Sequence, residues 1–95
     1  MTASKLAPET IEAWTAGLTK LLEGLDLFDT DDRVTFRGRV LDATDRTTVS
    51  RVRELAAHFG RPVAGNSTRS EAARALADTW IARAQQDAGT VGSRA

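Results

Sequence analysis

The sequence predicts a small all-α domain of three or four helices. Apolar residues recur at helical spacings of three and four in three separate segments, and helix-start and helix-stop signals bound those segments. The chain has 95 residues, of which 41% are hydrophobic, which is enough for one modest core. We therefore expect a single helical domain over residues 1–86, followed by a tail.

The N-terminal segment predicts an acidic amphipathic helix over residues 8–28. Pro8 suits the first helical position, because its missing N–H would have no partner there. Gly17 and Gly24 each weaken the helix by about 1 kcal/mol relative to Ala, so packing must hold it. We expect its apolar stripe to be buried within the domain, with a dimer contact as the minority interpretation. The stripe consists of Ile11, Trp14, Leu18, Leu21, Leu25 and Phe28.

Residues 29–32, Asp-Thr-Asp-Asp, predict a boundary between helices, because Asp and Thr cap helix N-termini well. The next residues, 34–41, leave two structures open. Apolar and polar residues alternate there as in a strand, whereas a helix would have only a ragged apolar face. A lone strand would need a second copy of the chain to pair with. We favour a short helix or an irregular segment.

Two further helices are predicted between residues 47 and 86. The first runs from about residue 48 to 59, with Thr47 or Thr48 as its cap and Gly60 as its end. The second begins at Thr68 and Glu71, which have the spacing of a capping box. The tail, residues 87–95, is small and polar without periodicity, so we expect it to be disordered. The predicted apolar face of the last helix is Ala72, Ala73, Leu76, Ala77, Trp80, Ile81 and Ala84.

The segment between these two helices reads as an ordered loop. Gly60 supplies a left-handed turn, and Pro62 fixes an extended backbone. Val63 is the one apolar side chain placed to plug the core. Gly65 and Asn66 tolerate positive φ and predict a second turn.

The pattern VSRVRELAAHFGRPVAGNSTRSEAARAL, residues 49–76, resembles the helix-extended-loop-helix motif of SAP domains and their bacterial relatives. Gly60, Pro62, Val63 and Gly65 match that motif. The chain departs from it at Arg61, where Leu is common, and in its longer second helix. The resemblance covers about thirty residues, and it implies DNA binding by the loop and the start of the second helix of a SAP-like unit over residues 47–86.

Local physics is compatible with that implication, because a helix N-terminus attracts phosphate through its free N–H groups and its dipole. His58 and Arg74 would extend the basic stripe. Binding of this kind is weak, sensitive to salt and largely independent of sequence. Ser67 and Thr68 are more often helix caps than phosphate ligands. The expected nucleic-acid-binding residues are Arg51, Arg61, Asn66, Ser67, Thr68 and Arg69.

Two alternatives remain open. The same loop, or the first helix, could dock a partner protein. If residues 34–41 form a strand, the chain looks similar to a dimeric ribbon-helix-helix repressor, in which Arg37 and Arg39 would read bases. The six-residue insertion between the two helices counts against that family.

The amino-acid composition argues against several other functional classes of protein. Without Cys or Tyr, and with one His, the chain offers no nucleophile–base pair or metal-ligand spacing, so we expect neither an enzyme nor a cofactor or small-molecule substrate. No signal peptide or membrane span is visible, which predicts a cytoplasmic protein. Residues 1–32 carry two Lys and seven acidic residues, whereas residues 33–95 carry eleven Arg and six acidic residues. This asymmetry suits an anionic partner, and it equally suits packing of one half against the other.

Overall fold

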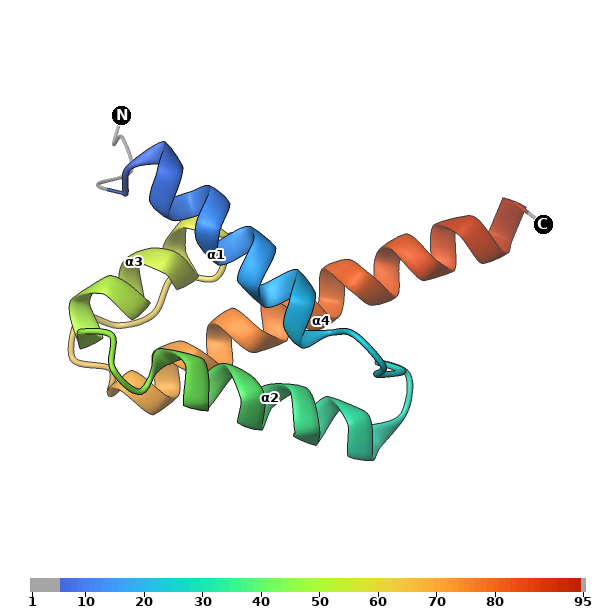
Figure 1. Cartoon of the computed structure of the whole chain (residues 1–95), viewed down its shortest axis with the longest axis horizontal. Helices are drawn as coiled ribbons and strands as arrows, with labels where there is room; N and C mark the ends of the chain where they lie inside the picture. The colour runs from blue at the N-terminus through green and yellow to red at the C-terminus, as the bar shows by residue number, and fades with distance from the viewer. Residues whose placement is uncertain (1–5, 95) are drawn as a thin grey trace.

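The computed structural model describes the backbone of residues 6–94 and the side chains of residues 6–87. Within that range the chain forms four helices and no strand, so the all-α class is confirmed (Figure 1). They are α1 (Pro8–Leu21), α2 (Thr30–Thr44), α3 (Val49–His58) and α4 (Arg69–Arg94). Residues 34–41 lie inside α2, so the strand that a ribbon-helix-helix repressor requires is a helix instead.

The long helix α4 organises the domain. It packs against α3 through its first half and against α2, while α1 packs across α2 (Figure 1). Alanines make up much of the buried face of α4, and their small side chains let the neighbouring helices approach closely. The core consists of Leu6, Leu18, Leu27, Phe36, Val40, Val52, Leu55, Ala56, Ala72, Ala73, Leu76, Ala77, Trp80 and Ile81.

Helix α1 is shorter than the predicted helix over residues 8–28. It ends at Leu21, and Gly24 then adopts a φ of 79°, which turns the chain out of the helix. Leu27 is buried, but Phe28, the last residue of the predicted stripe, is 60% exposed. Helical periodicity therefore continues in the sequence past the point where the helix stops.

Carboxylates order the connection from α1 to α2. Asp29 is the N-cap of α2, and its side chain accepts a hydrogen bond from the Asp32 N–H at 3.1 Å. Asp32 in turn accepts from the Asp26 N–H at 2.7 Å, and Asp26 accepts from the Phe28 N–H at 3.0 Å. The predicted helix boundary at residues 29–32 is confirmed, and its acidic residues satisfy backbone donors that the turn leaves unpaired.

Helix α2 buries a narrow face, since only Phe36, Val40 and Thr44 are buried along its 15 residues. This narrow face agrees with the weak apolar pattern of its sequence. Its arginines make the remaining contacts. Arg37 pairs with Asp78 of α4 at 2.8 Å, and Arg39 donates to the Leu21 carbonyl at the end of α1, also at 2.8 Å. The guanidinium groups thus fix α2 against two other helices.

The ends of α3 and α4 match the sequence prediction. Thr48 caps α3 by accepting from the Arg51 N–H. Thr68 accepts from the Glu71 N–H at 3.1 Å while Glu71 accepts from the Thr68 N–H at 2.7 Å, which is the predicted capping box. Helix α4 then continues through Arg94, where the sequence predicts a disordered tail from residue 87. Extending an established helix by one residue costs far less than starting a new one, which favours this continuation.

Substitutions at two glycines should change the stability of the domain in opposite directions. Gly60 has a φ of 105°, which a side chain rarely adopts, so Gly60→Ala should destabilise the domain by about 1–2 kcal/mol. Gly38 lies within α2 with nothing within 4 Å of an added Cβ, so Gly38→Ala should stabilise it by about 0.5–1 kcal/mol. Urea-induced unfolding followed by circular dichroism measures both changes. A loss of stability in Gly38→Ala would contradict the open surroundings of that residue.

No helix in the described part of the chain is both long enough and apolar enough to cross a lipid bilayer.

Candidate nucleic-acid interface

Basic residues gather at the end of the domain formed by α3, its flanking loops and the start of α4. Residues 45–76 contain six arginines and three acidic residues, whereas residues 8–32 contain one lysine and seven acidic residues. The α3–α4 loop and the α1–α2 connection lie at opposite sides of the molecule (Figure 1). The domain is therefore electrically polarised. The six arginines are Arg46, Arg51, Arg53, Arg61, Arg69 and Arg74.

The α3–α4 loop is held by its own hydrogen bonds and by one core contact. After Gly60, the Arg61 N–H donates to the Ala56 carbonyl at 2.9 Å, and the Ser67 N–H donates to the Ala64 carbonyl at 3.0 Å. Val63 is half-buried and packs against the core, as predicted. Residues 65 and 66 form the predicted second turn, although Gly65 does not need the positive φ that it tolerates.

Two guanidinium groups anchor the start of α4. Arg53 of α3 donates from Nε to the Ser67 carbonyl at 2.9 Å, and its terminal Nη2 donates to the same oxygen. Arg69 donates from Nε to the carbonyl of Thr47, in the α2–α3 connection, at 2.8 Å. Arg53 thus binds the carbonyl of a residue two positions before α4, Arg69 is the first residue of α4, and both guanidinium groups are tied to the backbone of another segment.

The N-terminus of α4 is already occupied in part by an acid. In the capping box, Glu71 accepts from the Thr68 N–H, and the Thr68 hydroxyl oxygen accepts from the Glu71 N–H. A phosphate at this position would meet the Glu71 carboxylate, which weakens the site expected from the helix dipole alone. Any phosphate contact must therefore come mainly from the arginine side chains.

The predicted site residues have different surroundings in the structure. Ser67 is buried, whereas Thr68 is exposed and its hydroxyl oxygen accepts a capping hydrogen bond, which leaves its O–H free to donate. Arg51 lies 3.7 Å from Glu54, which offsets part of its charge. Arg61 and Asn66 are exposed, and the Arg61 guanidinium has no acceptor among the described residues.

Sequence reasoning missed Arg53 and Arg46. Arg53 lies off the apolar stripe of α3, where the sequence pattern favours a solvent-facing side chain, yet it is half-buried against the loop. Its position one residue after the buried Val52 is the only local signal, and it does not reveal the Ser67 carbonyl as a partner. Arg46 is exposed next to Thr47, the residue to which Arg69 is bound.

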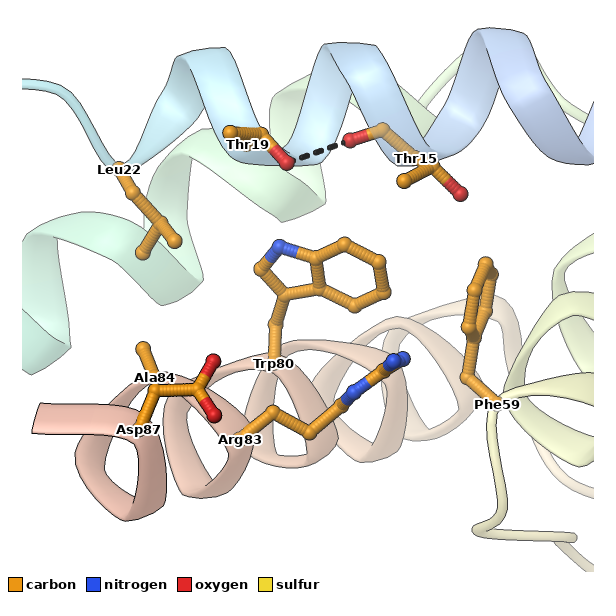
Figure 2. A pocket seen from close by; sticks show the side chains of 8 residues that line it. All are labelled: Thr15, Thr19, Leu22, Phe59, Trp80, Arg83, Ala84 and Asp87. Carbon is orange, nitrogen blue, oxygen red and sulfur yellow. Dashed lines mark hydrogen bonds between the residues drawn. The ribbon is translucent and has the colours of Figure 1, made fainter. Parts of the chain in front are cut away.

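A second surface feature lies between α1 and α4 and borders the α3–α4 loop at Phe59, the C-cap of α3. A hollow of about 330 Å³ is lined by the aromatic rings of Phe59 and Trp80, by Leu22, and by Arg83 (Figure 2). The two rings meet edge to face at 4.8 Å between centroids. The Arg83 guanidinium lies over both rings, 5.1 Å from the Trp80 centroid. No group of three or more His, Cys, Asp or Glu side chains suited to a metal ion occurs within the described residues.

No family model matches the chain, and no curated protein or solved structure shows significant similarity to it. The assignment of a function therefore depends on the polarised charge, the anchored arginines and the residues of the loop.

Proposed function

We propose that the chain is a non-enzymatic module that binds the phosphates of nucleic acid at its basic end. The observation that carries this proposal is the clustering of six arginines against three acids around the α3–α4 loop. Arg53 and Arg69 are held in place by backbone carbonyls, so their guanidinium groups lose little further freedom when an anion binds.

The exposed arginines supply the direct contacts. Arg61 and Arg74 are exposed and have no acidic partner among the described residues, so phosphate would replace only water around them. Such contacts read no bases, and the binding is therefore independent of sequence. The proposal keeps the DNA-binding role implied by the SAP resemblance. It assigns the main phosphate contacts to arginine side chains and not to the hydroxyl groups of Ser67 and Thr68.

The test is fluorescence anisotropy with a labelled duplex of ~20 base pairs at about 50 and 200 mM salt. Three phosphate contacts would lower the affinity about 40-fold over that fourfold change in salt. Arg61→Ala should weaken binding and reduce the slope of log K against log salt by about one contact. Its matched control is Lys20→Ala, which removes the same charge from an exposed position on α1.

Equal effects of Arg61→Ala and Lys20→Ala would show that net charge alone governs the binding and would exclude a site at the loop. Absence of binding at the lower salt would overturn the nucleic-acid proposal. The basic end would then be examined as a docking surface for an acidic protein.

A further inference from the structure

We propose that two copies of the chain pair through the face between α1 and α4, with Phe28 of each copy seated in the Trp80 hollow of the other. The proposal concerns the face between α1 and α4, which borders the basic end at Phe59, and it stands independently of the nucleic-acid proposal. It depends on two neighbouring hollows, an exposed aromatic side chain and the opposite charges that Arg83 and Asp26 bring to the two hollows.

The two hollows on this face are neighbours. The first, of about 330 Å³, contains Phe59 and Trp80, and the second, of about 220 Å³, contains Leu25 and Phe28. Leu22 and Ala84 line both hollows. The two hollows therefore adjoin along Leu22 and Ala84, and each combines apolar walls with polar side chains.

Phe28 is the exposed aromatic side chain on this face. It is 60% exposed, the largest exposed fraction among the bulky apolar residues described, and it belongs to the second hollow. The connection that carries Phe28 is fixed by Asp26, Asp29 and Asp32, so the ring projects from an ordered turn. An aromatic ring held out into water on a rigid segment is typical of a binding anchor.

The first hollow carries hydrogen-bond donors that are open to solvent. The indole N–H of Trp80 has no acceptor among the described residues, and since no buried side-chain nitrogen there lacks a partner, this nitrogen reaches solvent. Figure 2 shows the indole rising from α4 toward α1, with its nitrogen on the edge that faces α1. Arg83 lies over the rings, and among the described residues it makes no ion pair, even with Asp87, which lines the same hollow.

The second hollow supplies the matching acceptor. Asp26 lines it, and while its Oδ1 accepts the Phe28 N–H, its Oδ2 accepts no hydrogen bond in the described part of the chain. One hollow thus combines an aromatic cavity with open donors, and the other combines an aromatic side chain with an open acceptor. The two halves of the face complement each other.

A two-fold axis that passes over Leu22 and Ala84 lets both pairs of complementary hollows meet in one dimer. Rotation about that axis places the second hollow of one copy opposite the first hollow of the other. Phe28 then packs against the Trp80 and Phe59 rings of the second copy, and Asp26 approaches its Trp80 N–H and Arg83. Because the same patch serves both copies, the contact closes as a dimer and does not propagate into a filament.

The experiment is sedimentation equilibrium of the whole chain without nucleic acid, over about 5–200 µM. We expect a dimer with a micromolar Kd, and Phe28→Asp should weaken it at least about 30-fold. Val34→Asp is the matched control, since Val34 is 59% exposed and lines neither hollow. Circular dichroism checks that both variants retain the helices of the wild type.

A second measurement reports on the hollow itself. In a Trp14→Phe chain, the emission of Trp80 should change with protein concentration at the same midpoint as dimer formation. A wild type that stays monomeric throughout the range overturns the proposal. Equal weakening by Phe28→Asp and Val34→Asp, or assembly beyond the dimer, also overturns it. An effect of Phe28→Asp on the dimer while Arg61→Ala alone affects DNA binding would separate this surface from the basic end.

Discussion

Replacing Phe36 with alanine should cost about 3–5 kcal/mol of unfolding free energy, the largest effect expected of any single substitution in this domain. Phe36 has no exposed surface and is the largest fully buried side chain described. It lies on α2, which packs against both α1 and α4, so the cavity would open where three helices meet. Total stabilities of small domains are about 5–15 kcal/mol, and the variant should therefore be partly unfolded at low urea concentration.

Urea-induced unfolding followed by circular dichroism measures this loss. Val34→Ala is the matched control, because Val34 lies on the same helix but is 59% exposed. It should change stability by no more than about 0.5 kcal/mol. Similar costs for the two substitutions would mean that α2 does not bury the Phe36 face.

Arg53→Ala is expected to cost about 1–3 kcal/mol, since it leaves the carbonyl of the buried Ser67 without its donors. Both hydrogen bonds come from one guanidinium group, and they join α3 to the residue that precedes the capping box. Arg53→Lys keeps the charge but loses the fork of N–H groups, so it should recover only part of the loss. The same unfolding measurement compares the three chains.

Arg51→Ala provides the control for Arg53, because it makes the same chemical change on the same helix. Arg51 makes only a partly exposed ion pair with Glu54 at 3.7 Å, which contributes about 0–1 kcal/mol. If Arg51→Ala proves as costly as Arg53→Ala, the contact with Ser67 does not anchor the loop.

The candidate site could be predicted from the sequence only as a region. The loop, its basic surroundings and its core contact at Val63 all followed from residue types and order. Which arginines are open to a ligand did not follow, because Arg53 and Arg69 are bound to carbonyls 14 and 22 residues away. The sequence also did not indicate that Phe28 would be exposed, since it continues the apolar stripe of α1.

Local chemistry determined the all-α class, the ends of α3, the capping box of α4 and the cap at Asp29, because these hydrogen bonds join residues three or four positions apart. The sequence did not determine where α1 stops or whether residues 34–41 are helical, irregular or a strand, and tertiary structure decided between these alternatives for both segments. Their stabilising partners are distant in the chain: Arg39 reaches the Leu21 carbonyl across 18 residues, Arg37 reaches Asp78 across 41, and Gln85 reaches the Leu27 carbonyl across 58. Hydrophobic periodicity is evaluated over a short window of sequence, so it carries no information on contacts between distant residues. These contacts outweigh the weak local preference of the segments for helix or strand.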